Sequence, residues 1–231
     1  MDSQTCSLLT EFPFRHNYSF ELETAINKQI HLELKGSYTY LAMAFHFDGN
    51  DVALCNIAKW FARQSAEERQ HAHKMCKWQN SRGGRVILAS LENPDKNEWG
   101  SALEAFQAAL VYEKNCNESL HNLHALASKN SDSQTCDFLE QNFLSQQVNL
   151  IEQIGKIIMS VTPKIFRICE FLEDEAFLGH KMDSAEELNK FLAHLKRIGK
   201  NLGEFIFDKD LEEKVQCLCL SECAGVENKM D

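Results

Sequence analysis

The sequence predicts an all-α protein: a four-helix bundle with a long crossover between helices two and three, plus extra C-terminal helices. Three observations predict this fold class. Four long segments place apolar residues at helical spacing, and a glycine-containing stretch separates the second segment from the third. Only three prolines and ten glycines occur in 231 residues, which leaves room for long uninterrupted helices.

The first two predicted helices span about residues 20–48 and 50–79. The stripe on the first comprises Ile26, Ile30, Ser37, Leu41 and Ala44. The stripe on the second comprises Leu54, Ile57, Phe61, Met75 and Trp78. Asn50 and Asp51 are suitable N-caps, so we expect the second helix to open near them. The stretch 80–98 then interrupts the helical pattern, and its length suggests a crossover that runs the length of the bundle.

The third predicted helix spans about residues 97–129, and the fourth starts near Ser133. The third has a nearly unbroken spacing of three and four residues through Trp99, Leu103, Phe106, Leu110, Leu120, His124 and Ala127. The fourth places Leu144, Ile151, Ile154 and Ile158 in register. Pro163 should end or kink it, because proline lacks the backbone N–H and clashes with the preceding turn.

The segment after Pro163 exceeds what a four-helix bundle requires, and an internal repeat accounts for part of it. Cys136–Glu140 (CDFLE) recurs as Cys169–Glu173 (CEFLE), which suggests a partial tandem copy of the fourth helix. Chance similarity between two acidic amphipathic helices is the alternative. The predicted organisation is a flexible arm (1–16), the bundle (17–162), an extra helix resembling a second copy of helix four (163–199), a short C-terminal helix (200–212) and a tail (213–231).

Composition excludes several classes of function. The formal net charge of -10 argues against a nucleic-acid or anionic-membrane partner. No apolar run approaches the ~20 residues of a membrane span, and the N-terminus does not have the pattern of a secretory signal. The nine cysteines include no C-x-x-C pair, which favours free thiols in a reducing compartment. We therefore expect a soluble cytoplasmic protein.

Polar residues interrupt the inward stripes near the midpoints of all four predicted helices. They keep the spacing of their apolar neighbours, which places them on the core face. They are Glu33 and Tyr40 on the first helix, Glu68 and His71 on the second, Glu113 on the third and Gln147 on the fourth. Unpaired ionised carboxylates in a core are costly or become protonated. A pair of divalent cations would neutralise them, and carboxylates with one imidazole and open positions suit iron better than a closed zinc site.

Simpler interpretations stay open for each residue taken alone. A single inward glutamate can lie near the rim or pair with Lys or Arg, and Tyr40 can be a packed core residue or lie beside the metals. Glu118 and His121 repeat the Glu-x-x-His spacing. Because Glu118 is five residues from Glu113, it is turned roughly 140° away on the helical period, so we expect this pair on the surface or at an interface.

Long segments resemble animal ferritin heavy chains almost continuously from about Asn17 to Gly155, and again near Leu195–Asp208. They include AINKQIHLELKGSYTYLAMAFHFD, DVALCNIAKWFARQSAEERQHAHK, QNSRGGRVIL, CDFLEQNFLSQQV and EFIFDKD. The resemblance implies a subunit for intracellular iron storage that binds two iron ions and oxidises Fe(II) with oxygen. Light-type ferritin subunits lack the ligand set that is found here. Assembly with other ferritin subunits, in a possible 24-subunit shell, is implied as well.

The resemblance also assigns roles to individual residues. Glu33, Glu68 and His71 would bind the first iron, and Glu68 would bridge to a second that Glu113 and Gln147 complete. Further residues match accessory positions of the catalytic site (Glu67 and Tyr40) and positions of the threefold channel (His124, Cys136, Asp137 and Glu140).

The sequence also departs from the family pattern. Gln70 and His73 stand where the family has two cavity-facing acids, and Lys35 replaces an aromatic residue. In the second helix-four copy, Lys181 falls near the place of Gln147, so we expect the first copy to dock in the bundle. Two other interpretations remain: a non-catalytic or assembly-impaired iron-binding subunit, and a different di-iron carboxylate enzyme.

Overall fold

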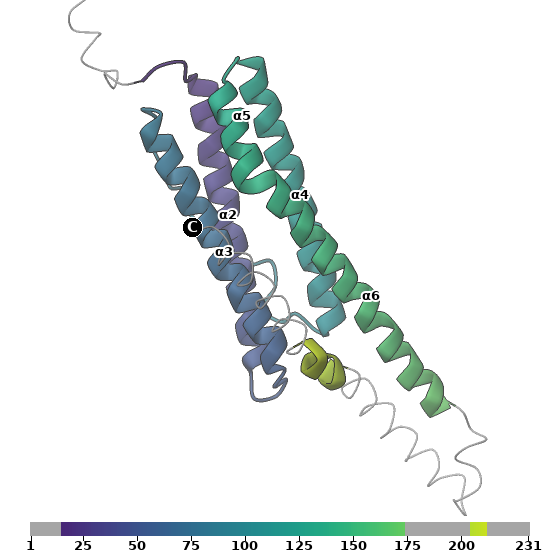
Figure 1. Cartoon of the computed structure of the whole chain (residues 1–231). Coiled ribbons are helices and arrows are strands. Elements are labelled where there is room, and N and C mark those ends of the chain that lie inside the picture. Colours follow the sequence, from purple (N-terminus) through teal and green to yellow (C-terminus); the bar gives the residue numbers. More distant parts are fainter. Residues whose placement is uncertain (1–14, 174–203, 212–231) are drawn as a thin grey trace, which may run out of the picture.

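The computed structural model describes residues 15–173 and 204–211 (Figure 1). Its helices are α2 (Phe20–Asp48), α3 (Cys55–Ser81), α4 (Ala102–Lys129), α5 (Ser133–Leu139), the π-helical turn η1 (Glu140–Leu144), α6 (Ser145–Glu173) and a short helix at 204–211. Within these ranges there is no strand, and no helix is long and apolar enough to cross a lipid bilayer. The predicted all-helical class is confirmed. Most of the predicted arm, the predicted helix beyond Glu173 and the predicted tail lie outside the described residues.

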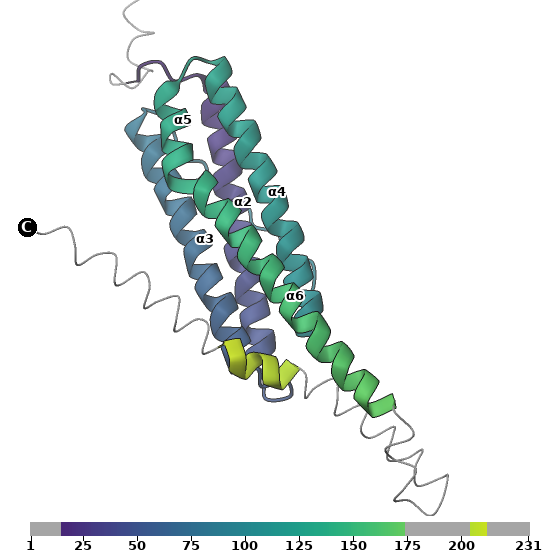
Figure 2. The ribbon, with the colours of Figure 1, turned by 45° about the vertical axis from the view of Figure 1, so that its right-hand side comes forward.

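The long helices α2 and α6 run in one direction, and α3 and α4 run in the other (Figures 1 and 2). The connection between α3 and α4 follows α2 along its length. Asn27 bonds the backbone of Arg85 and Ile87, Lys35 pairs with Glu92 at 3.2 Å, and the His46 ring lies 3.2 Å from the Gly100 carbonyl oxygen. The predicted crossover is therefore confirmed.

The bounds of α2 agree with the prediction, but one member of its predicted inward stripe is wrong. Leu41 is 41% exposed, whereas Ile30, Glu33 and Tyr40 are each at most 2% exposed. Leu41 follows Glu33 by eight residues, so it is rotated by about 80° from Glu33 on the helical period. That rotation puts Leu41 at the edge of the buried face.

The start of α3 differs from the prediction. Asn50 and Asp51 do not cap the helix; they lie in a turn in which the Ala53 N–H donates to the Gly49 carbonyl at 2.7 Å. Ala53 has a φ of 53°, in the left-handed region, so the helix cannot extend back through it. The helix begins at Cys55, and Leu54 provides no side-chain cap.

The short helix 204–211 supplies the missing cap. The Asp208 carboxylate accepts the backbone N–H groups of Asn56 and Ile57, both at 2.8 Å, in the first turn of α3. In the same way, Glu204 accepts the Ala102 N–H at 3.0 Å in the first turn of α4. A carboxylate at a helix N-terminus satisfies free N–H groups and opposes the helix dipole. The yellow segment in Figures 1 and 2 therefore closes one end of the bundle.

The helix α4 starts later than the predicted position near residue 97. Gly100 has a φ of 66°, and Ser101 caps the helix through a capping box with Glu104. Trp99 thus precedes the helix, but its side chain is still buried in the core.

The fourth helix begins at Ser133 as predicted, but it contains the π-helical turn η1, which the sequence analysis did not identify. Thr135, Leu139, Phe143 and Gln147 are all buried, although they follow one another at steps of four residues. In a regular α-helix each such step drifts by about 40°, and the wider π turn takes up this drift. Phe143 and Gln147 therefore both reach the interior.

Pro163 does not end the fourth helix, which was one of the two predicted outcomes. The helix α6 continues to Glu173, so the predicted boundary at residues 162–163 falls inside a helix. The second repeat copy, which starts at Cys169, begins in the last turns of α6. In both views α6 extends beyond the ends of the other long helices (Figures 1 and 2).

The apolar interior forms two clusters, one towards each end of the bundle. One contains Tyr18, Ile30, Met75, Leu120 and Phe143, and the other contains Tyr40, Phe61, Phe106, Ile154 and Phe207. On α2 the first cluster ends at Ile30 and the second starts at Tyr40. Buried polar side chains lie on the helices between these clusters.

We expect Asp208→Ala to lower the free energy of unfolding by about 1–3 kcal/mol, because two buried N–H groups of α3 lose their acceptor. Chemical denaturation of the full chain followed by circular dichroism measures the change. The control is Asp95→Ala, which removes an equal charge from an exposed site. Equal stability of the two variants would contradict the capping role.

Candidate metal centre

Each long helix contributes a polar side chain to the middle of the bundle. Glu33 comes from α2, Glu68 from α3, Glu113 from α4 and Gln147 from α6, and each is at most 6% exposed. They stand at the inward positions predicted from the sequence. The bundle therefore buries three carboxyl groups in one region, which makes cation binding the first function to consider.

Glu33, Glu68 and His71 form one cluster. One ligand atom from each of the three side chains lies within 4.8 Å of the others, an arrangement that could hold a metal ion. The His71 Nδ1 atom is 3.6 Å from Glu33 Oε2 and 3.5 Å from Glu68 Oε1. The other carboxylate oxygen of Glu68, Oε2, is buried without a hydrogen-bond partner within the described chain.

Glu113 is held by two neighbours from other helices. The Tyr40 hydroxyl donates to Glu113 Oε1, and Gln147 Nε2 donates to Glu113 Oε2 and to the Glu113 backbone carbonyl at 3.0 Å. Tyr40 is itself packed in the apolar core, with its ring centroid 6.0 Å from that of Phe61. Tyr40 is thus both a packed core residue and a hydrogen-bond donor to the carboxyl group.

Glu68, Glu113 and His71 have perturbed pKa values. Burial, and then the neighbouring charge of Glu33, raise the pKa of Glu68 well above its usual range. Burial raises the pKa of Glu113 to about 7, although the hydrogen bonds from Tyr40 and Gln147 oppose this shift. Burial would lower the pKa of His71, but the adjacent Glu33 and Glu68 carboxylates outweigh it and raise that pKa to about 10. The cluster therefore retains protons that a bound cation would displace.

Supporting residues that the sequence analysis missed orient Glu33. The Ser119 hydroxyl of α4 donates to Gln29 Oε1, and Gln29 Nε2 donates to Glu33 Oε1 at 2.7 Å. Gln29 lies one turn before Glu33 on the same face of α2 and is 1% exposed. An inward amide one turn from an inward carboxylate is a signal that sequence reasoning could have used.

Gly36 lets α4 approach α2 beside the cluster. The Tyr112 hydroxyl donates to the Leu32 carbonyl at 2.6 Å, and its ring crosses directly over Gly36. A Cβ atom at position 36 would collide with the Tyr112 hydroxyl and ring. The absence of a side chain at Gly36 therefore sets the spacing of the two helices that carry Glu33 and Glu113.

Several predicted residues lie outside the cluster. Glu67 is half-buried and pairs with Arg63 at 3.8 Å, one turn before it on α3. Glu118 and His121 are exposed, as predicted from their angle on α4. They do not add a second inward Glu-x-x-His pair, which a different di-iron carboxylate enzyme would need.

The predicted channel residues gather where α4 meets α5 and η1. His124 Nε2 lies 2.7 Å from Glu140 Oε1, and Cys136 Sγ lies 3.8 Å from the His124 carbonyl oxygen. Asp137 is exposed. Cys136 is a free thiol, as are Cys55, Cys76 and Cys116.

The donor set fits a hard or borderline divalent cation. Carboxylate oxygens and one imidazole are ligands of ferrous iron, and the partnerless Glu68 Oε2 atom is a donor position that a cation would satisfy. Glu113 and Gln147 provide a second pair of oxygen donors on the opposite helices. The arrangement can hold cations and favour their higher oxidation state, because concentrated negative charge stabilises the more positive ion.

Comparison with known proteins identifies the family that the chain resembles. Residues 23–161 match the family described as "Ferritin-like domain". The chain is 42% identical over 196 residues to the soma ferritin of Lymnaea stagnalis, an alignment that covers 85% of this chain and 93% of that protein. The family match contains Glu33, Glu68, His71, Glu113 and Gln147.

We expect the metal-free protein to lose stability as the pH rises from 5 to 8. A carboxyl group whose pKa is raised in the folded state stabilises the fold fully below its unfolded value of 4.5, and this contribution is lost as the pH rises through about 7. The loss attributable to Glu113 is on the order of 1–3 kcal/mol. Denaturation in a chelator at both pH values measures it.

Glu113→Gln should flatten this pH dependence, whereas Glu118→Gln, an exposed carboxyl on the same helix, should leave it unchanged. A slope that is identical in the native chain and in Glu113→Gln would show that the buried carboxyl does not carry the effect.

Proposed function

Since the chain belongs to the ferritin family, we propose that it is an iron-storage subunit of the heavy, catalytic type, which oxidises Fe(II) to Fe(III) with oxygen. The observation that carries this proposal is the buried cluster of Glu33, Glu68 and His71 beside Glu113 and Gln147. A storage subunit without oxidase activity has no need of three buried carboxyl groups, of which Glu68 and Glu113 have pKa values raised by desolvation.

Two iron ions are the substrate in this proposal. Glu33, Glu68 and His71 would bind one ion, and Glu68, whose Oε2 atom has no hydrogen-bond partner within the described chain, would also serve the second. Glu113 and Gln147 complete the second position. Each Fe(II) ion gives up one electron, and oxygen accepts the electrons.

The chain's own residues position the ions and handle protons. Gln29 fixes the orientation of Glu33, and Tyr40 together with Gln147 fixes that of Glu113. Iron binding displaces the protons that the carboxyl groups and His71 retain, so uptake should release protons. The apolar clusters on both sides keep the site shaped and limit its contact with bulk water.

We also propose that the subunit works in the cytoplasm, within a shell of ferritin subunits. His124, Cys136, Asp137 and Glu140 would line the entry channel of that shell, where their carboxylates attract cations. Glu67, near the cluster on α3, would be an accessory residue on the route of the iron. The net charge of -10 favours attraction of Fe(II) to the surface.

We expect the double variant Glu68→Ala/His71→Ala to slow iron oxidation by at least about 100-fold, because both ions lose a ligand. The measurement is the rise of ferric absorbance after aerobic addition of two Fe(II) ions per chain. The matched control is Glu118→Ala/His121→Ala, which removes the same residue types at the same spacing from the exposed face of α4. Equal rates for the two double variants would overturn the oxidase assignment.

A second candidate, an assembly-impaired iron-binding subunit, is favoured by one observation. The helix α6 extends beyond the other helices of the bundle and continues through Pro163. In a shell, the neighbouring subunits would have to leave room for this longer end of α6.

We expect the full chain to sediment as a large closed particle, about 640 kDa for 24 copies of the 26.5 kDa chain. Analytical ultracentrifugation of the metal-free protein provides this measurement. A particle of one or two chains would favour the assembly-impaired candidate, and the oxidase assay above remains independent of that outcome.

A further inference from the structure

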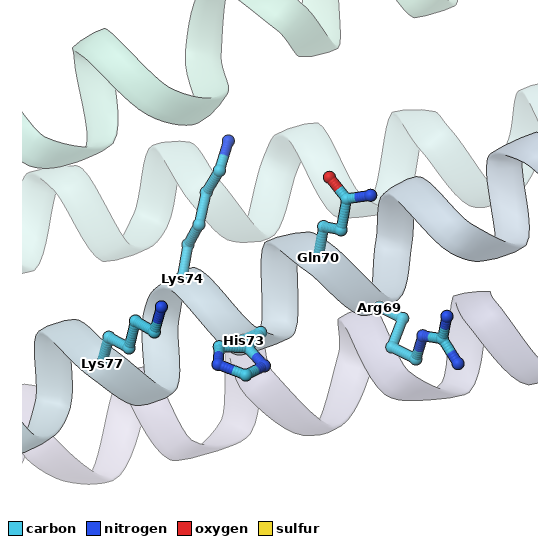
Figure 3. A pocket seen from close by; sticks show the side chains of 5 residues that line it. All are labelled: Arg69, Gln70, His73, Lys74 and Lys77. Carbon is cyan, nitrogen blue, oxygen red and sulfur yellow. The ribbon is translucent and has the colours of Figure 1, made fainter.

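The exposed face of α3 carries a basic pocket. Its lining consists of Arg69, Gln70, His73, Lys74 and Lys77, and its volume is about 450 Å³ (Figure 3). Every lining residue comes from two turns of one helix. The pocket is separate from the carboxylate cluster, which lies on the inward face of the same helix.

The cations of this pocket lack counter-charges. Among the described residues, none of Arg69, Lys74 and Lys77 forms an ion pair, whereas Arg63 on the same helix pairs with Glu67 at 3.8 Å. The whole chain carries a net charge of -10, so three uncompensated cations within two helical turns are a local reversal of sign. A pocket of this composition attracts anions.

The helical spacing places the lining residues in two adjacent rows on α3. Arg69, His73 and Lys77 follow one another at steps of four and so form one row, and Gln70 and Lys74 form a second row beside it. Figure 3 shows Lys74 and Gln70 pointing to one side of the helix and Arg69 and His73 lying along the other. Lys74 and Lys77, three residues apart across the two rows, are neighbouring like charges, and an anion between the rows would relieve their repulsion.

We propose that this pocket binds an inorganic oxyanion, with phosphate as the simplest example. The Arg69 guanidinium can donate two parallel hydrogen bonds to phosphate oxygens, and the two lysine ammonium groups add charge-assisted bonds. The amide of Gln70 supplies a further donor. Gln70 and His73 stand where the family pattern has two cavity-facing acids, so this face lacks two carboxylates that would repel an anion. The proposal does not depend on iron oxidation.

The test measures phosphate binding to the metal-free full chain by equilibrium dialysis at low ionic strength. We expect saturable binding of about one phosphate per chain. The pocket variant Arg69→Gln/Lys74→Gln/Lys77→Gln should bind at least about tenfold more weakly, because it loses every full positive charge in the pocket. The control variant Lys28→Gln/Lys96→Gln/Lys114→Gln changes the net charge equally at exposed positions elsewhere and should bind phosphate as the native chain does.

Two results would overturn the proposal: no saturable phosphate binding by the native chain, or equal weakening in the pocket and control variants. The second result would show that phosphate binding depends on the net charge of the chain and not on the residues of this pocket. Circular dichroism checks that each variant is folded. If the triple variant is not folded, Lys74→Gln and Lys77→Gln are tested singly, and each must weaken binding more than Lys114→Gln.

Discussion

Burial of negative charge at the centre of the bundle is the constraint on which the rest of the structure depends. Glu33, Glu68 and Glu113 lie between two apolar clusters and are at most 2% exposed. Such groups must be protonated, hydrogen-bonded or neutralised by a cation. Raised pKa values favour protonation of Glu68 and Glu113. Gln29 donates a hydrogen bond to Glu33, and Tyr40 donates one to Glu113. Because Glu68 Oε2 has no hydrogen-bond partner within the described chain, neutralisation by a bound cation is the solution that the arrangement favours.

The inward positions of the cluster could be predicted because they depend only on helical period. Glu33, Glu68, Glu113 and Gln147 each share a face with apolar neighbours, and four long helices leave one common interior for them. The helical period also led to one wrong prediction. Leu41 lies beside the buried stripe of α2 and was assigned to it, but its side chain is exposed. The partners Gln29 and Ser119 were missed, because a hydrogen bond between two helices depends on their relative heights, which the period does not specify.

The ends of the helices were harder to predict, because they depend on residues far away in the sequence or on local backbone geometry. Asn50 has the chemistry of a cap, but the left-handed Ala53 lies between it and the helix. The actual cap of α3 is Asp208, which is 152 residues away from Asn56. Pro163 shows the opposite case, where a strong local breaker is tolerated inside a long helix. Local rules thus describe the helix interiors well and the helix ends poorly.

The capping contacts of the short helix also determine the order in which the molecule can be completed. Asp208 and Glu204 accept N–H groups in the first turns of α3 and α4, so Asn56, Ile57 and Ala102 lack these acceptors until residues 204–208 have been synthesised. Contacts of such large sequence separation form late, because the intervening chain must first be closed into a loop. On the ribosome, the helices that carry the carboxylates emerge long before the segment that seals their ends. A nascent chain can therefore assemble the carboxylate cluster while one end of its bundle is still frayed, and synthesis of the segment 204–211 then closes that end.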